Sequence, residues 1–314
     1  MELDDAPAGP IVVIGSSGMD IIGRPHRSLV PGSSSPGEVR RCPGGVARNV
    51  AENLARLGSQ VILITAVGDD AVGAEILAQA AEVGIDTRLA TIVPGGRTGF
   101  YLAMLNDLGL LHVALDDMGL TQALSSDIIR QAKPTLQEAH AIFMDGNVPG
   151  ASAAEVIRIA KAAGVPVAAD PTSVALASRW KPHLEDLWLI TPNEAEAEAL
   201  CPHPVPHADR EQALDAARHL VSEGVEIALV TMAEFGVGYA SPESSGHVPA
   251  VQTDVVDPTG AGDALSAAVI FSLLSGIPLD ESVRLGASAA SLTLRTPGSV
   301  VGDLSLERLY DGLR

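Results

Sequence analysis

A short stretch near the C-terminal end of the sequence combines a carboxylate with bare backbone. Residues 255–269 read VVDPTGAGDALSAAV, in which Gly260, Ala261 and Gly262 precede Asp263 at the start of a predicted helix. Small residues let a ligand approach the backbone, and the first N–H groups of a helix lack partners within it. Such amides can stabilise an oxyanion, and a neighbouring carboxylate can accept a proton from a hydroxyl group. The stretch suits attack of a hydroxyl group on phosphorus, although a tight turn with a capping aspartate explains these residues equally well.

A second stretch has residue types that suit a sugar. In CPGGVARN (residues 42–49), Gly44 and Gly45 precede a predicted helix, and Asn49 follows one turn later. The glycines allow close backbone approach, and the amide can bind a sugar hydroxyl group. Asp20, just past the first predicted strand, can accept hydrogen bonds from a vicinal diol. A glycine helix start and a turn carboxylate are the competing interpretations.

Two common phosphate-binding patterns are missing from the sequence. A P-loop requires GxxxxGK[ST], and the chain contains no Gly-Lys pair. A dinucleotide-binding fold requires GxGxxG after its first strand, where GSSGMD provides only Gly15 and Gly18. The sequence therefore argues against both P-loop and dinucleotide chemistry.

Composition narrows the class of protein and its partners. The 314 residues are 46% hydrophobic and 19% charged, which suits one large α/β domain. The net charge of −19, with three lysines, disfavours nucleic acid and acidic membranes as partners. The two cysteines form no disulfide framework, and the acidic N-terminus MELDDAPAGP is unlike a signal peptide. We expect a cytoplasmic protein.

His203 and His207 lie in the proline-rich CPHPVPH, which disfavours the helix that a metal site with this spacing needs.

Apolar runs alternate with helical patterns along most of the chain. Predicted strands cover 11–15, 60–68, 141–145, 165–170, 187–191 and 226–231, and predicted helices cover 46–57, 71–84, 151–164, 209–224, 260–275, 279–294 and 305–313. Continuous apolar strands between helices indicate a parallel sheet covered on both faces. Residues 19–43, rich in Gly, Pro and Ser, and a hairpin over 98–117 with its turn at 106–109 interrupt this pattern. We expect them to form a small separate sheet.

Polar residues follow the predicted strands where each one ends. They are Asp145, Asn147, Asp170, Asn193, Thr231 and Asp257. Each alone is a good helix cap or turn residue. Because ligands of open parallel sheets bind beyond the carboxyl ends of the strands, six such residues together predict a cleft at this edge.

The two glycine-rich segments resemble the signatures of a known family. PGGVARNVAENLARLG with ITAVGDD, and DPTGAGDALSAAVIFSLLSG, are similar to motifs of the ribokinase-like (PfkB) carbohydrate and nucleoside kinases. The resemblance covers nearly the whole chain. It implies one domain over residues 1–314, an α/β fold with three α/β/α layers and a mostly parallel sheet, and a β-sheet lid formed by about 16–43 and 97–118. VVIGSSGMDIIG, LNDLGLLHVALDDM and DPTS are most similar to the branch of pseudouridine kinases.

The resemblance assigns roles to the residues of the two segments. It makes Asp263 the base that deprotonates a sugar 5′-hydroxyl group, which attacks the γ-phosphate of ATP, with Gly260, Ala261 and Gly262 as the anion hole. Asp20, Gly44, Gly45 and Asn49 match sugar-binding positions. Thr98 and Tyr101 on the lid and Asn147 on the cleft edge are candidate contacts to the base or sugar, although a plain β-surface role suits the first two equally well.

The resemblance also implies cofactors. Asn193 and Glu196 in TPNEAEAE match an N-x-x-E element near the phosphates and Mg²⁺, although an exposed helix carboxylate is the alternative for Glu196. Thr231 and Gly236 match a loop beside the nucleotide, in which Ala233 replaces a usual glycine. Asp257 and Thr259, with Thr293, Thr296 and Gly298, match a site for a monovalent cation, K⁺. Gly302 stands where ribokinases have a serine. In relatives the lid can also form a dimer interface, so a homodimer is expected.

Several functions remain open on the sequence. The first is ATP-dependent 5′-phosphorylation of pseudouridine, and the second is the same reaction on ribose, adenosine or another nucleoside. A non-catalytic sensor of sugars or nucleosides would keep the fold but lose the base or the anion hole, whereas this chain has Asp263, Gly260 and Gly262. An oxidoreductase lacks its fingerprint.

Overall fold

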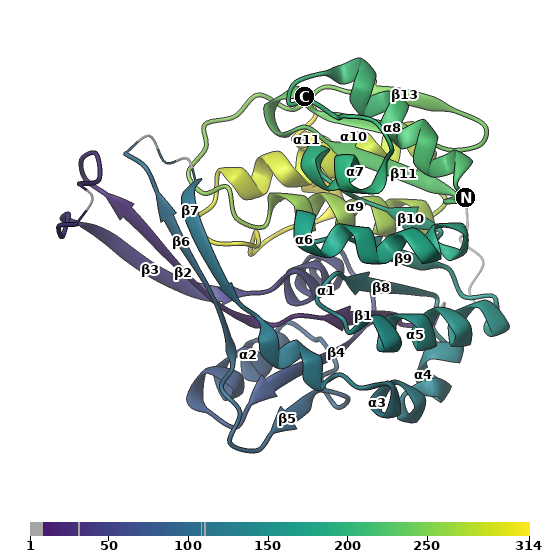
Figure 1. Ribbon diagram of the computed structural model, residues 1–314, viewed down its shortest axis with the longest axis horizontal. Helices are drawn as coiled ribbons and strands as arrows, with labels where there is room; N and C mark the ends of the chain where they lie inside the picture. Colours follow the sequence, from purple (N-terminus) through teal and green to yellow (C-terminus); the bar gives the residue numbers. More distant parts are fainter. Residues whose placement is uncertain (1–8, 31, 108, 110) are drawn as a thin grey trace.

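A nine-stranded sheet forms the centre of the computed structural model, which describes residues 9–30, 32–107, 109 and 111–314 (Figure 1). Its strand order is β13-β12-β11-β10-β9-β8-β1-β4-β5. The strands are β1 (Ile11–Gly15), β4 (Val61–Gly68), β5 (Thr91–Val93), β8 (Ala141–Asp145), β9 (Val167–Asp170), β10 (Leu189–Ile190), β11 (Ile227–Thr231), β12 (Val237–Ala240) and β13 (Ser245–Val248). All neighbours from β11 to β5 pair in parallel, and β12 and β13 are antiparallel. The mostly parallel sheet is confirmed.

Helices cover both faces of this sheet, because alternate residues of each strand point to opposite sides (Figure 1). Val12 and Ile14 face the layer of α3, α4, α5, α7 and α8, and Ile11 and Val13 face α1, α9 and α10. The helices are α1 (Val46–Arg56), α2 (Ala71–Glu82), α3 (Ser126–Gln131), α4 (Lys133–Gln137), α5 (Gly150–Ala163), α6 (Val174–Ala177), α7 (Glu194–Leu200), α8 (Arg210–Ser222), α9 (Ala261–Leu274), α10 (Leu279–Leu294) and α11 (Leu306–Asp311). The three-layer prediction is confirmed. Of the helices described, none has the length and apolarity to cross a bilayer.

Several elements differ from those predicted. Strand β10 has only two residues, and the short strand β5 and the antiparallel pair β12 and β13 were not predicted. β5, β12 and β13 are short strands at or next to an edge of the sheet, and so short a segment gives little periodic signal. The acidic N-terminal segment MELDDAPAGP lies outside the described residues except for its last two positions, because the described residues begin at residue 9.

A second sheet projects from the body on the side where the parallel strands end (Figure 1). It consists of β3 (Gly37–Gly44), β2 (Gly18–Pro25), β6 (Gly99–Leu105) and β7 (Leu111–Asp117) in that order. We call this sheet the lid. β6 and β7 form the predicted hairpin, although Leu108 of its predicted turn lies outside the described residues. In the register, Cys42, Asp20, Tyr101 and Asp116 form one row across the four strands.

Candidate active site

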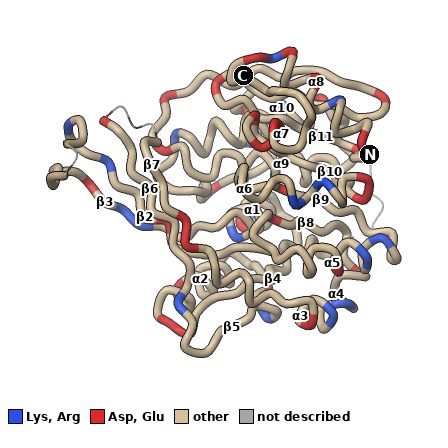
Figure 2. The backbone as a smooth tube through the Cα atoms, in the orientation of Figure 1, with Lys and Arg blue, Asp and Glu red and all other residues tan. Residues whose placement is uncertain are grey.

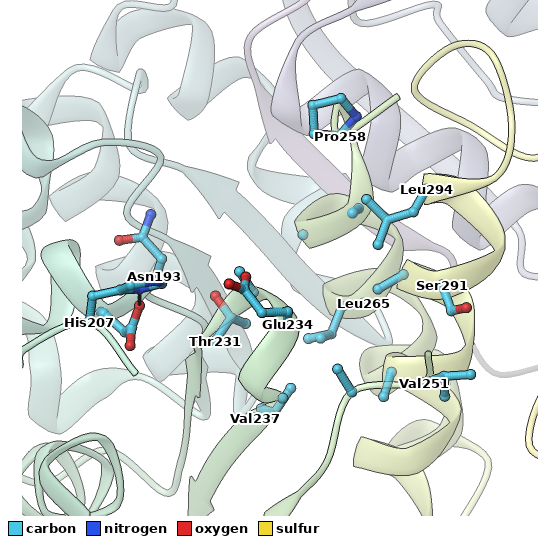
Figure 3. Close-up of a pocket in the computed structure, with 18 of the residues that line it drawn as sticks. Asn193, His207, Thr231, Glu234, Val237, Val251, Pro258, Leu265, Ser291 and Leu294 are labelled. Atoms are coloured by element: carbon cyan, nitrogen blue, oxygen red, sulfur yellow. Dashed lines mark hydrogen bonds and ion pairs between the residues drawn. The ribbon is translucent and has the colours of Figure 1, made fainter. Parts of the chain in front are cut away.

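A cleft lies beyond the carboxyl ends of β10 and β11, and of the six strand-end residues predicted to form one, Asn193 and Thr231 line it. It has a volume of about 810 Å³, within the usual range for small-molecule sites. Asn193 and Thr231 line one side, and Ala261 and Gly262 at the start of α9 line another; Figure 3 shows the side chains around this space. The cleft therefore joins the predicted nucleotide residues to the predicted anion hole.

The N-terminus of α9 is built to expose its amides. Gly260 has φ +78°, and a β-carbon there would overlap the backbone of Ser299, so a glycine is required. A β-carbon at Gly262 would meet no heavy atom within 4 Å. The first intrahelical bond is donated by Ala264 to the Gly260 carbonyl group at 2.9 Å, which leaves the preceding amides unpaired by helix geometry. These amides face a space that an anion can fill.

Asp263 lies where the anion hole meets the predicted sugar residues. Its Oδ2 accepts a hydrogen bond from Asn49 Nδ2 at 2.7 Å. Asn49 is oriented by Ser299, whose hydroxyl donates to its Oδ1 at 3.0 Å, and by Arg48, which donates to the same oxygen at 3.1 Å. Gly262 lines the cleft, whereas the next residue, Asp263, is buried and contacts α1. The side chain of Asp263 therefore stands between the two halves of the site.

The paired glycines before α1 make room for Asp20. A β-carbon on Gly44 would overlap the Asp20 carboxylate, and one on Gly45, at φ +93°, would overlap the backbone of Ser16 and Ser17. Only glycine can occupy these two positions while Asp20 and the loop of Ser16 and Ser17 keep their present positions. The structure thus brings together all four predicted sugar residues around a buried carboxylate.

Burial raises the pKa of both central carboxylates. The pKa of Asp263 rises to about 7 because the side chain is buried and Asp145 is nearby, although the Asn49 hydrogen bond and Arg48 oppose the change. The pKa of Asp20 also rises to about 7, through burial and through the charges of Asp263 and other carboxylates. A carboxylate with a pKa close to neutral is matched to accepting a proton near pH 7.

Asp145 holds the site together, a role that its position at a strand end did not reveal. Its Oδ2 accepts hydrogen bonds from Ser16 N at 2.7 Å, Ser16 Oγ at 2.6 Å and Ala47 N at 3.1 Å, and its Oδ1 accepts one from Asn147 N at 2.9 Å. It thereby joins the end of β8 to the loop after β1 and to the start of α1. The carboxylate is fully buried, and burial raises its pKa.

The predicted nucleotide residues lie together on the other side of the cleft. Asn193 forms an isolated parallel bridge with Thr231. Asn193 Oδ1 accepts from Glu196 N at 3.0 Å, and Glu196 Oε2 accepts from Asn193 N at 2.9 Å, which is a capping box for α7. Glu196 is also buried, which argues against the alternative of an exposed helix carboxylate.

Asp170 was predicted only as a cleft-edge residue, but in the structure the charge of Glu196 acts on it. The pKa values of both are raised, mainly by burial, and the charge of Glu196 raises that of Asp170 further. Glu196 is buried and Asp170 is partly buried, and carboxylates in such a position suit Mg²⁺, which needs few protein ligands. Within the described ranges no group of three or more His, Cys, Asp or Glu could hold a metal ion.

Two hydroxyl groups of the cleft fit a bound nucleotide. Thr253 Oγ1 and Ser291 Oγ are buried and have no hydrogen-bond partner among the described residues, and both residues line the cleft. A buried hydroxyl group without a partner is unfavourable until a ligand supplies one.

Ala233 adopts φ +45°, which explains why a glycine is usual at this point of the loop.

Three predicted lid and cleft-edge contacts have different surroundings. Thr98 is buried, and its hydroxyl group donates to Asp70 at 2.7 Å and accepts from Gly68 N at 2.9 Å, so it anchors the base of the lid. Tyr101 lies beside Asp20 in the lid register and is partly buried. Asn147 donates its backbone N–H to Asp145, as described above. Of the three, Tyr101 has the position that best suits a ligand contact.

The residues predicted to bind a cation lie close together, but Arg40 already forms an ion pair with the Asp257 carboxylate. Asp257 Oδ1 accepts from Thr259 N at 3.0 Å, and Oδ2 accepts from Gly298 N at 2.9 Å. Arg40 of β3 forms an ion pair with the same Oδ2. The Asp257 carboxylate is fully buried, so its charge is balanced by the guanidinium. This arrangement does not fit K⁺.

The second half of the predicted cation site would act mostly through carbonyl groups, and of these the Thr293 carbonyl group accepts a hydrogen bond from Thr296 N at 2.9 Å. The hydroxyl groups of Thr293 and Thr296 donate to carbonyl groups of α10 at 3.0 Å. The Gly302 carbonyl group, where a serine is usual, accepts a hydrogen bond from Arg56 of α1.

His203 and His207 have separate partners. His207 Nδ1 lies 2.7 Å from Glu194 Oε2, and the His203 ring packs edge-on against His219 at 5.9 Å between centroids.

Comparison with known proteins gives the context of this site. The model of the family described as pfkB family carbohydrate kinase matches residues 9–304. The chain is 34% identical to the pseudouridine kinase of Escherichia coli K12 over 94% of both chains. It is 28% identical to the ribokinase of Haemophilus influenzae, over 92% of this chain and 93% of that one. The fold matches that of Arabidopsis thaliana ribokinase complexed with ribose and ATP at a TM-score of 0.83, with 24% identity, covering 98% of this chain and 99% of the other.

Proposed function

Because the chain belongs to the pfkB family of carbohydrate kinases, and is therefore a phosphotransferase acting on an alcohol group, we propose that it phosphorylates the 5′-hydroxyl group of pseudouridine with ATP. One observation carries the proposal. The Asp263 carboxylate lies directly after the exposed amides of α9 and hydrogen-bonds Asn49 of the sugar-binding segment at 2.7 Å. A base and an anion hole are thus adjacent to one acceptor site.

In this mechanism each residue has a separate task. Asp20 and Asn49 hold the sugar, and the Asp263 carboxylate accepts the proton of the 5′-hydroxyl group. The 5′-oxygen then forms a bond to the γ-phosphorus while the bond from that phosphorus to the β–γ bridging oxygen breaks, releasing ADP. The amides at the start of α9 stabilise the charge on the transferred group. The lid over the acceptor site excludes water and so limits hydrolysis of ATP.

ATP and Mg²⁺ are part of this proposal. Asn193, Thr231 and Gly236 border the space for the nucleotide, and the orphaned hydroxyl groups of Thr253 and Ser291 are available to it. Asp170 and Glu196 would hold Mg²⁺, directly or through water. The ion would neutralise the phosphate oxygens and orient them.

The choice of pseudouridine rests on similarity of sequence. The chain is more similar to the pseudouridine kinase of E. coli than to the ribokinase of H. influenzae, at 34% against 28% identity. The main alternative is phosphorylation of ribose or another nucleoside at the same site, since the residues around Asp263 recognise only the sugar.

The test is an ATP-consumption screen of the purified protein across pseudouridine, uridine, cytidine, adenosine and ribose. Phosphorus NMR of the product would establish which hydroxyl group is modified. Selective turnover of pseudouridine to its 5′-phosphate is expected. Preference for ribose would replace the substrate but keep the chemistry, and binding of a nucleoside without ATP consumption would indicate a sensor.

We also propose that the outer face of the lid binds the lid of a second copy. On this face Val39, Leu102, Val113 and Leu115 are 75%, 44%, 58% and 66% exposed. Acidic residues are spread over the body (Figure 2), so a nucleic acid or acidic membrane is an unsuitable occupant, whereas an apolar face can pair with itself about a two-fold axis. Light scattering should give a dimer, and V113D with L115D should give a monomer. A monomeric wild-type protein at assay concentration would refute this interface.

A further inference from the structure

The anion hole depends on a clamp between two loops. The Asp257 carboxylate joins them by accepting the N–H groups of Thr259, in the loop before α9, and Gly298, in the loop after α10. The N–H groups of Val256 and Asp257 donate to the Leu294 carbonyl group at 2.8 and 3.1 Å. This clamp places the second loop directly under the N-terminus of α9.

The contact between the loops is tight at the point where the anion hole begins. Gly260 lies against the Ser299 backbone so closely that a β-carbon would overlap it. Ser299 also donates to Asn49 Oδ1 at 3.0 Å. A shift of the second loop would therefore move both the α9 amides and the partner of Asp263.

The clamp requires a positive charge beside Asp257. The carboxylate is 0% exposed, and a buried ionised carboxylate without a counter-charge is strongly unfavourable. Arg40, whose side chain is 33% exposed, provides this charge through its ion pair with Oδ2. In the register Arg40 pairs with Ile22, two positions from the Asp20 row and hence on the same face of the lid.

We propose that the Arg40 guanidinium is the built-in cation of this anion hole, so that phosphoryl transfer by this chain does not depend on K⁺. The proposal rests on the proposed kinase function. A monovalent ion at Asp257 would face the guanidinium as a like charge. For unit charges about 4 Å apart, such repulsion weakens binding by on the order of a thousandfold.

Unlike a free ion, Arg40 is covalently part of the lid, so its ion pair with Asp257 links the lid to the body. Arg40 belongs to β3 of the lid, whereas Asp257 belongs to the body. The counter-charge therefore reaches the clamp together with the lid that carries Asp20. Arg40 acts as a positioning residue that couples coverage of the acceptor to the geometry of the α9 amides.

The test compares wild type, R40A and R41A in potassium, sodium and tetramethylammonium chloride at matched ionic strength. R41A is the matched control, because it removes the same charge from the adjacent position of β3. The Arg41 side chain lies on the opposite face of the lid and forms an ion pair with Glu75 at 3.2 Å. Initial rates give kcat and KM, and thermal unfolding without substrate gives a reading independent of activity.

For wild type, kcat and the melting temperature should be the same in all three salts, and the same should hold for R41A. R40A should lose about tenfold to a hundredfold in kcat in tetramethylammonium, with partial rescue by K⁺ or dilute guanidinium. Its melting temperature should become higher in K⁺ than in tetramethylammonium. Strong activation or stabilisation of wild type by K⁺, or an R40A enzyme indifferent to every cation, would overturn the proposal.

Two further measurements keep the result interpretable. If R40A does not fold, R40Q preserves much of the side-chain volume, and the wild-type salt series still decides the question. If no alcohol is phosphorylated, the proposed function fails, whereas the cation dependence of unfolding still tests the role of Arg40.

Discussion

Replacing Asp263 with asparagine should abolish catalysis and, at the same time, stabilise the protein. The substitution is nearly isosteric, and the new side-chain oxygen can keep the hydrogen bond from Asn49 Nδ2 that Asp263 accepts at 2.7 Å. It removes the proton acceptor and the buried charge. Loss of a positioned base typically costs 10²- to 10⁴-fold in rate, so we expect kcat to fall by about 10³-fold or more. Binding of the nucleoside should be largely retained.

The stability gain follows from the raised pKa. Burial raises the pKa of Asp263 from 3.8 to about 7, so the folded protein binds this proton more tightly than the unfolded chain. The resulting stabilisation is complete below about pH 4 and is lost as the pH rises through 7. The difference corresponds to about 4 kcal/mol, an upper bound on the gain of D263N over wild type at pH 8. Below pH 4 the two proteins should be equally stable.

The assay is urea unfolding of both proteins at pH 5 and pH 8, combined with the pH dependence of kcat/KM. The wild-type kcat/KM should rise with pH and level off above about 7, because the ionised carboxylate is the base. D215N, at an exposed carboxylate of α8, is the matched control and should change neither quantity. A D263N enzyme with near-normal turnover, or one less stable than wild type at pH 8, would refute the reasoning.

Three other substitutions test neighbouring parts of the site. D20A should raise the KM for the nucleoside more than it lowers kcat, and initial rates with varied nucleoside would show this; an unchanged KM would remove Asp20 from the sugar site. G44A should have the same effect on KM, because its β-carbon would displace the Asp20 carboxylate, and unaltered kinetics would contradict that geometry. A233G should raise the free energy of unfolding by about 0.5–1 kcal/mol, because Ala233 has φ +45°, and a loss of stability in urea would show that its backbone is not strained.

The parts of the site that could be predicted are those whose chemistry is local in sequence. The α9 amides, Gly260 and Asp263 lie within four residues, so one segment contains both the helix start and the proposed base. Gly44 was predicted to allow close approach of a ligand, and the structure adds a specific reason, the space for Asp20. The alternation of apolar strands and helices likewise gave the parallel sheet, since each element has its own periodicity.

The parts that could not be predicted depend on contacts between distant segments. Asp145 ended a predicted strand, but its bonds to Ser16 and Ala47 connect residues 129 and 98 positions away. Thr98 was placed on the lid, but only the fold shows that Asp70 uses its hydroxyl group. Arg40 gave no signal at all, because an arginine in a glycine- and proline-rich segment is ordinarily a surface residue.

The arrangement of charges explains why such contacts matter here. Asp20, Asp145, Glu196 and Asp263 are buried at one edge of the sheet in a chain of net charge −19. Their mutual repulsion and burial raise the pKa values that make a base effective near neutrality, at a cost to the stability of the unliganded protein. Asp257 lies close enough to raise the pKa of Asp20, yet its counter-ion is fixed in the chain. In the proposed mechanism, the permanent guanidinium of Arg40 maintains the contact between the two loops at the start of α9, and the substrates balance the charges of the other carboxylates. The proposed site thus separates the charge that maintains its shape from the charges that would perform the reaction.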